Sequence, residues 1–249
     1  MRRTHVTVVL PAYNEAATVG SLLDRLAYAL DDEDIPYNVI VVDDGSTDDT
    51  ALVVEARGSP YVEIVRHEKN GGLGEAIRTG LLRAIEQAGE REVIVTMDAD
   101  NSHGPGLIVR MLRAINEGFD VVIASRFVPG ARVVGVPLSR RILSRGASLL
   151  FRLRYPITGV RDFTSGYRAY RSTVLVEAFA ERGPYLIRAS GFSSMVELLL
   201  GLRKRGLQMT EVPILLRYDR KGGRSKMRIW ENVRDLLWML IKRPDSVAR

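Results

Sequence analysis

The feature that most limits what this chain can fold into is the alternation, along residues 4–124, of short apolar runs with longer amphipathic stretches. The apolar runs are rich in Val and Ile at consecutive positions, which is typical of strands covered on both faces. We expect strands over Thr4–Leu10, Asn38–Val42, Val62–Val65, Val93–Met97 and Val121–Ala124, and helices over Glu15–Leu30, Asp49–Arg57, Gly74–Ala88 and Leu107–Asn116. This order predicts an α/β fold with a mostly parallel, doubly wound sheet and helices on both faces.

Composition removes several classes of protein. The chain has 249 residues, of which 46% are hydrophobic and 27% are charged, so it is neither disordered nor collagen-like. It has no cysteine, which excludes a disulfide scaffold, a thiolate nucleophile and cysteine-bound zinc. No apolar run approaches the roughly 20 residues of a membrane-spanning helix. We expect a single domain over residues 1–249, with no integral membrane segment and no signal peptide.

The charge is unevenly divided between the two halves of the chain. Residues 1–125 hold 11 Lys and Arg against 21 Asp and Glu, whereas residues 126–249 hold 25 against 9. The net charge of +6 therefore combines an acidic first half with a strongly basic second half. A basic surface attracts phosphates, nucleic acid or an anionic membrane, and charge alone does not choose among them.

Polar segments follow three of the predicted strands. Pro11–Glu15 comes after the first strand, Asp43–Ser46 after the second, and Asp98–Ser102 after the fourth. In an open α/β sheet, ligands bind at the carboxyl ends of the strands, so these segments are expected to meet at one edge. The sequence therefore predicts a ligand site rich in carboxylates there.

The aspartates of these segments allow two interpretations. Asp98 and Asp100, two positions apart behind a buried strand, suit a hard divalent cation that also binds a diphosphate. For Asp43, Asp44 and Asp48 the plainer alternative is that they form turns and helix N-caps. Of the three histidines, only His103 adjoins the predicted metal segment.

Gly71–Gly74 opens the third predicted helix, as a dinucleotide-binding loop would. However, Ile77 stands where that motif has its third glycine, and the segment follows the third strand instead of the first. No GxxxxGK[ST] sequence occurs, which excludes the P-loop nucleotide hydrolases.

Nine short segments, in order along nearly the whole chain, resemble the family 2 glycosyltransferases of the GT-A fold. Among these enzymes the resemblance is to the polyprenyl-phosphate (dolichol-phosphate) mannosyltransferases. The segments are Leu10–Glu15, Val41–Thr47, Asn70–Gly74, Met97–Asp100, Ala124–Arg126, Arg140–Ser144, Asp162–Gly166, Glu211–Pro213 and Arg224–Lys226. The first four are shared widely in family 2, and the others are narrower. The resemblance implies one GT-A catalytic domain, with a nucleotide-sugar half at 1–125 and an acceptor half at 126–249.

The resemblance also implies roles for individual residues. Those that would bind a GDP-mannose donor are Pro11, Tyr13, Glu15, Val42, Asp44, Asp98, Ala99, Asp100, Arg220 and Lys226. Asp98 and Asp100 would bind Mg²⁺ or Mn²⁺, and Ser102 stands where some members have a metal-binding glutamine. Arg126, Arg140 and Ser144 match the positions that hold the acceptor phosphate, and the expected catalytic residues are Asp98, Asp100 and Arg126.

The residues themselves fit a phosphate acceptor. Transfer to a hydroxyl needs a general base, and processive members carry a Glu-Asp pair and a Gln-x-x-Arg-Trp segment. Ser194–Glu197 and Arg228–Trp230 stand in those places and match neither. A phosphate monoester is already ionised at neutral pH and needs only cations to position it. Glu197, within the apolar stretch Phe192–Leu202, is either a buried partner of an arginine or a catalyst.

The expected reaction is inverting transfer of mannose from GDP-mannose to a polyprenyl phosphate. UDP-glucose or another nucleotide sugar is the alternative donor. A noncatalytic nucleic-acid-binding domain is the alternative from another class, and it would need aromatic side chains among the arginines for base stacking. Aromatic residues are only 7% of the chain, so we expect no nucleic-acid partner.

Two segments near the C-terminus complete the expectations. Arg217–Lys226 holds two glycines among five basic residues and is expected to close over the donor diphosphate. A helix over 227–243 has an apolar stripe from which Trp238 and Met239 are excluded, so both would stay exposed if the stripe docked on the domain. This pattern predicts peripheral attachment to the cytoplasmic face of a membrane, with simple docking of the helix as the alternative.

Overall fold

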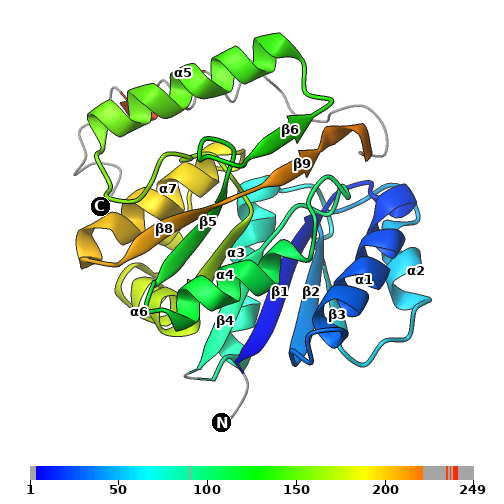
Figure 1. Ribbon diagram of the computed structural model, residues 1–249. Helices are drawn as coiled ribbons and strands as arrows, with labels where there is room; N and C mark the ends of the chain where they lie inside the picture. The colour runs from blue at the N-terminus through cyan, green and yellow to red at the C-terminus, as the bar shows by residue number, and fades with distance from the viewer. Residues whose placement is uncertain (1–3, 90, 221–233, 235, 237, 241–249) are drawn as a thin grey trace.

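The structure, a computed structural model, describes residues 4–89, 91–220, 234, 236 and 238–240. Helices pack against both faces of a central seven-stranded sheet (Figure 1). The elements in chain order are β1 (His5–Ala12), α1 (Ala16–Asp31), β2 (Tyr37–Asp43), α2 (Thr50–Glu55), β3 (Val62–Arg66), α3 (Leu73–Gln87), β4 (Glu92–Thr96), α4 (Leu107–Asn116), β5 (Val121–Ser125), β6 (Arg132–Val134), α5 (Leu138–Arg154), β7 (Arg168–Arg171), α6 (Ser172–Arg182), η1 (Gly183–Leu186), α7 (Ser193–Leu202), η2 (Arg203–Arg205), β8 (Met209–Pro213), β9 (Leu215–Arg217) and η3 (Tyr218–Arg220). The strands and helices expected between residues 4 and 124 are all present.

The sheet has the order β3-β2-β1-β4-β7-β5-β8. Every neighbouring pair is parallel except those of β7, which runs antiparallel to both β4 and β5. The expected mostly parallel sheet is therefore confirmed, with one reversed strand near its middle. Because β1, β2 and β4 are parallel neighbours, the three polar segments that follow them lie at the same edge.

Consecutive apolar residues of the strands serve two separate cores. In β1, Val8 packs into the core beneath α1 and α4, whereas Val9 packs into the core beneath α3, α6 and α7. Side chains alternate between the faces of a strand, so a strand covered on both sides needs apolar residues at every position. This is the physical reason that the apolar runs identified the strands.

The reversed strand β7 carries an arginine into the middle of the sheet. Arg168 is fully buried, and its guanidinium donates to the carbonyl oxygens of Met195 at 2.6 Å and Phe163 at 2.7 Å. These bonds offset part of the large free energy of burying the charge. The arginine thereby ties β7 to α7 and to the loop that precedes β7.

A second layer lies beyond the carboxyl edge of the sheet. There β6 and β9 pair in parallel, and α5 extends across the top of the molecule (Figure 1). The inward side of α5 buries Ser148 and Phe151, and Tyr155 follows directly after the helix. This layer brings the second half of the chain over the edge where the polar segments end.

Most of the expected helix at 227–243 lies outside the described residues. Met239 is buried, and its carbonyl oxygen accepts a hydrogen bond from the Tyr155 hydroxyl at 2.7 Å. The expectation that Met239 stays exposed is wrong, because this residue packs into the core beside Tyr155. Trp238 is exposed, as expected. None of the helices in the described residues combines the length and the apolar character needed to cross a bilayer.

Candidate active site

The predicted metal segment forms the loop between β4 and α4. Asp98 is partly exposed, whereas Asp100 and Ser102 are buried. One oxygen of Asp100, Oδ1, accepts bonds from the Ser102 amide at 3.1 Å and the Ser102 hydroxyl at 2.6 Å. Ser102, expected as a third metal ligand, therefore donates a hydrogen bond from its hydroxyl group to Asp100.

The loop offers the oxygen atoms that a divalent cation prefers. Carboxylates are the usual protein ligands of Mg²⁺ and Mn²⁺ beside a diphosphate, which supplies further oxygens. Gly166 leaves room for this chemistry, because a Cβ there would lie 3.3 Å from Oδ1 of Asp98. Across the described ranges, no three His, Asp or Glu side chains converge into a complete metal site. The residues thus fit a cation that the protein and the donor hold together.

A pair of stacked aromatic rings contacts the same loop. His103 stacks on Tyr167 with ring centroids 5.1 Å apart, and its Nδ1 accepts the Asp98 amide at 3.4 Å. The Tyr167 hydroxyl donates to the carbonyl oxygen of Gly104 at 3.1 Å. Burial raises the pKa of Tyr167, so the phenol stays protonated and keeps this bond. His103 therefore contributes to the position of Asp98.

Asp44 organises a neighbouring loop. Its Oδ1 is 2.7 Å from Nδ1 of His67 and accepts the Gly71 amide at 2.9 Å, while Oδ2 accepts the Gly72 amide at 2.8 Å. A carboxylate has about four lone-pair positions, of which these contacts use three. The predicted contact with the nucleoside would therefore use the remaining acceptor position on Asp44.

Gly72 and Gly74 are required by a close approach between the two halves of the chain. A Cβ on Gly74 would lie 1.7 Å from the carbonyl oxygen of Ala189, and Gly72 has a φ of 88°. The Gly74 amide donates to the carbonyl oxygen of Ser190 at 2.8 Å. The segment is thus a packing contact, in agreement with the exclusion of a dinucleotide-binding loop.

Glu197 on α7 fixes the other side of this contact. Its Oε2 accepts the backbone amides of Arg188 at 2.7 Å and Ala189 at 2.8 Å. Glu197 therefore contacts an arginine, Arg188, but through the main chain of that residue. The sequence could not identify this partner, because every residue except proline has a backbone amide.

The remaining predicted donor residues lie along the edge formed by β1, β2 and β4. Pro11 and Val42 are neighbours across β1 and β2, and Ala99 is buried in the metal loop. Tyr13 is half-buried. Glu15 is buried, and its side chain accepts the Thr18 hydroxyl at 2.7 Å.

The structural interpretation of Asp43 and Asp48 agrees with their contacts. Oδ1 of Asp43 accepts the Ser46 amide at 3.1 Å and closes a turn. Oδ1 of Asp48 accepts the Thr50 amide at 3.0 Å at the start of α2. Both residues shape the loop that follows β2.

Arg126, at the end of β5, is paired with a carboxylate that the sequence-based site did not include. Its Nε and Nη2 donate to the two oxygens of Asp162 at 2.8 and 2.6 Å, and Nη2 also donates to Thr164 at 2.7 Å. Burial alone would raise the pKa of Asp162, but the Arg126 guanidinium outweighs it and holds that pKa below its usual range. Nη1 of Arg126 has no partner among the described residues, so it can still donate to a ligand.

A basic pocket opens beside Arg126, between α5 and the segment that joins β5 to β6. It has a volume of about 580 Å³ and is lined by four arginines together with Phe127, Pro129 and Leu149 among others. The arginines are Arg126, Arg145, Arg152 and Arg161. Within the part of the chain that the structure describes, no carboxylate pairs with the last three. The pocket therefore carries a strong positive charge.

Of the predicted phosphate-binding residues, two are only partly placed and one lies wholly outside the described residues. Ser144 is half-buried in α5, and Arg140 belongs to the same helix, but the side chain of Arg140 lies outside the description. The side chain of Arg220 and all of Lys226 also lie outside it. Their roles stay predictions. The sequence-based site lacked Arg145, Arg152 and Arg161. The second half of the chain has many arginines, and nothing in the sequence distinguished these three from the others.

Comparisons with known proteins agree with the family resemblance of the sequence. Residues 7–179 match the family model described as glycosyl transferase family 2. An undecaprenyl-phosphate mannosyltransferase of Micrococcus luteus is 34% identical over 89% of this chain and 87% of its own length. A dolichol-phosphate mannosyltransferase of Pyrococcus furiosus is 34% identical over 98% of this chain, which spans 66% of that relative.

Solved structures confirm the fold class. The chain superposes on glucosyl-3-phosphoglycerate synthase from Mycobacterium tuberculosis, solved with Mn²⁺, UDP and glucosyl-3-phosphoglycerate, with a TM-score of 0.65. The sequences are 24% identical, and the match covers 96% of this chain and 77% of the other. The GT-A architecture expected from the sequence is therefore present. With this fold and a family match over most of its length, the chain belongs to glycosyl transferase family 2.

Proposed function

We propose that the protein transfers mannose, with inversion, from GDP-mannose to a polyprenyl phosphate, using Mg²⁺ or Mn²⁺ held at Asp98 and Asp100. The observation that carries this proposal is the basic pocket at Arg126, which opens at the same edge of the sheet as the metal loop, because β4 and β5 run in the same direction. Burial would lower the pKa of the Arg126 guanidinium, but Asp162 raises it above its usual range, and the nearby Asp98 carboxylate adds to this effect. The names of the two relatives support mannose as the sugar and a polyprenyl phosphate as the acceptor.

The arginines perform the acceptor's part of the reaction. The pocket at Arg126, Arg145 and Arg152 holds the acceptor phosphate, and one of its oxygens attacks the anomeric carbon of mannose. The new carbon–oxygen bond forms as the bond to the diphosphate breaks, so configuration inverts and GDP leaves. No proton has to be removed, because the phosphate monoester is already ionised. The divalent cation, when bound, supplies charge stabilisation for the leaving diphosphate.

A donor screen tests this function. We expect radiolabelled GDP-mannose, with a short polyprenyl phosphate and Mn²⁺, to give an organic-extractable mannolipid, and UDP-glucose to give little product. The Arg152→Ala substitution should raise the KM for the lipid phosphate more than the KM for the nucleotide sugar. The control substitution Arg110→Ala, on α4, should change neither KM. Product from UDP-glucose alone would support the alternative donor. No product from any donor would contradict the function.

We further propose that α5 attaches the protein to a membrane surface. Six apolar side chains of this helix are exposed: Leu138, Ile142, Leu143, Leu149, Leu150 and Leu153. Arg145 and Arg152, which flank this apolar face on the helix, also line the basic pocket. An apolar face bordered by cations is typical of a helix that lies in the headgroup region of an anionic bilayer. The polyprenyl chain would then enter the pocket from the bilayer. Attachment to the cytoplasmic face of the membrane, as expected from the sequence, stays a prediction.

Flotation with anionic vesicles tests the membrane proposal. We expect Leu149→Ser/Leu153→Ser to weaken vesicle binding about a hundredfold, because each buried leucine contributes roughly 1.5 kcal/mol or more. The control is Leu52→Ser, which removes an exposed leucine of α2 and should float as the wild type does. Failure of the wild type to float, or equal flotation of both variants, would contradict a role for α5.

A further inference from the structure

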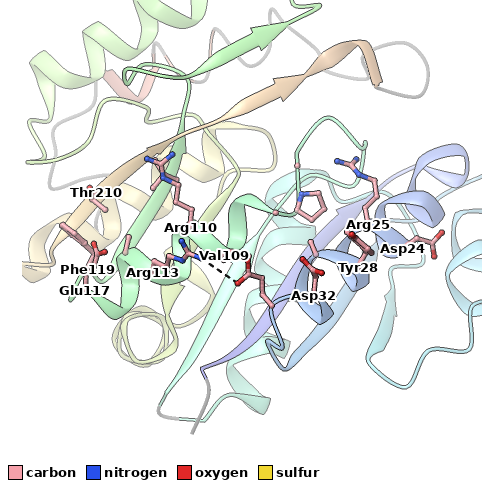
Figure 2. Close-up of a pocket in the computed structure, with 17 residues that line it drawn as sticks. Asp24, Arg25, Tyr28, Asp32, Val109, Arg110, Arg113, Glu117, Phe119 and Thr210 are labelled. Atoms are coloured by element: carbon pink, nitrogen blue, oxygen red, sulfur yellow. Dashed lines mark ion pairs between the residues drawn. The ribbon is translucent and has the colours of Figure 1, made fainter. Parts of the chain in front are cut away.

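An open groove lies between α1 and α4, on the face of the sheet opposite α3, α6 and α7. Its volume is about 1030 Å³, and its walls carry side chains of both charges, including the ion pair of Arg113 with Glu33 (Figure 2). Figure 2 shows Arg25 extending from α1 toward the loop that precedes α4. The same loop carries Asp98 and Asp100, so one end of the groove adjoins the metal segment.

Arg25 contacts the metal loop directly. Its Nη1 donates to Oδ1 of Asn101, the residue that follows Asp100. The other end of the Asn101 amide, Nδ2, donates to the Ser21 hydroxyl at 3.2 Å. One side chain of the loop is therefore held at both ends by residues one turn apart on α1.

Asn101 needs this support because of its backbone conformation. Its φ is 62°, in the left-handed region that most residues avoid, although asparagine tolerates it better than others. This conformation turns the chain between Asp100 and Ser102, whose amide and hydroxyl both donate to Asp100. The direction in which Asp100 presents its carboxylate thus depends on the turn at Asn101.

Two other contacts of the loop do not act on this turn. Asp98 is held through His103, and the carbonyl oxygen of Ser102 accepts the Arg217 amide at 2.9 Å. Neither contact involves the side chain of Asn101. A hydrogen bond from a charged guanidinium is stronger than one between neutral groups, so Arg25 makes the stronger of the two bonds to this amide.

We propose that Arg25 is a positioning residue which, through Asn101, sets the geometry of Asp98 and Asp100 and so the affinity of the protein for its divalent cation. This inference rests on the proposed metal-dependent donor site. Residues that orient metal ligands from outside the site affect metal affinity about tenfold to a hundredfold.

Measurement of Mn²⁺ binding tests the proposal without relying on activity. Free Mn²⁺ is followed by electron paramagnetic resonance in the presence of saturating GDP. We expect Arg25→Met to raise the dissociation constant for Mn²⁺ by about tenfold or more. The matched control is Arg110→Met on the α4 wall of the same groove, which removes the same charge and should change the constant less than twofold.

A second variant separates the side-chain contact from the backbone turn. Asn101→Gly keeps the left-handed conformation without strain but removes the amide, so it should weaken Mn²⁺ binding as much as Arg25→Met does. Arg25→Met/Asn101→Gly should be no weaker than either single variant, because both remove the same contact. Additive losses would show that the two residues act separately and would overturn the proposal.

Two failures are distinguishable in this experiment. If the wild type binds no Mn²⁺ with GDP, the proposed metal site is wrong and this inference falls with it. If the wild type binds Mn²⁺ and Arg25→Met binds it equally well, only the positioning role is overturned. A melting temperature within a few degrees of that of the wild type shows that a variant is folded. If Arg25→Met is not folded, Arg25→Lys replaces it as the milder variant.

Discussion

Turnover should fall about a thousandfold when Asp100 is replaced by Asn, with little change in melting temperature. The substitution keeps an oxygen that can accept the bonds from Ser102 at 3.1 and 2.6 Å, so the loop retains its turn. It removes the negative charge that the proposed cation requires. Loss of metal stabilisation of the leaving diphosphate amounts to several kcal/mol, and about 4 kcal/mol corresponds to a thousandfold in rate.

Single-turnover kinetics at saturating donor and acceptor measure this effect. Asp32→Asn serves as the control, since this exposed carboxylate follows the C-terminal end of α1 and its removal should leave turnover unchanged. The wild type should also lose activity in excess EDTA and regain it with Mn²⁺. Full transfer activity in EDTA would contradict the assignment of Asp98 and Asp100.

The second large effect is on stability and concerns the pair of Asp162 with Arg126. Asp162→Asn leaves the Arg126 guanidinium without its counter-charge in a largely buried place, with 23% of the side chain exposed. Breaking a buried pair in this way costs about 3–5 kcal/mol, and the partial exposure favours the lower end. For a chain of this size, about 3 kcal/mol lowers the melting temperature by roughly 6–12 °C.

The same pair predicts a dependence of stability on pH. Because the pKa of Asp162 is lower in the folded protein than in the unfolded chain, folding favours the ionised carboxylate. This contribution is fully present above the ordinary aspartate pKa of about 3.9 and is lost as the pH falls through the lower folded value. The stabilising effect of Asp162 should therefore begin to decline below about pH 4 and continue to fall as the pH approaches the lower folded pKa.

Urea unfolding at several pH values between 3 and 7 measures both effects. The free energy of unfolding should differ most between wild type and Asp162→Asn near neutral pH, and the difference should shrink in acid. The control is Asp24→Asn, which breaks an exposed pair with Arg57 and should cost less than about 1 kcal/mol. An equal loss in the two variants would contradict a special role for the buried pair.

Local patterns in the sequence determined the first half of the fold and the type of ligand. Runs such as Val39–Val42 are short, β-branched and apolar at every position, which is typical of a strand covered on both faces. The polar segments after β1, β2 and β4 then had to meet, because parallel neighbouring strands end at one edge. Asp98 and Asp100 were identifiable because their spacing and position in the chain are local properties.

Contacts between residues far apart in the chain were decided by the tertiary structure. β7 reads as a polar segment with two arginines, yet it lies inside the sheet because the carbonyl oxygens of Phe163 and Met195 accept the Arg168 guanidinium. The pairing of Arg126 with Asp162 and the contact of Arg25 with Asn101 are likewise absent from any periodicity. A residue type shows what a side chain can bind, but only the packing of the whole chain selects its partner, since many arginines and carboxylates of this sequence could have paired.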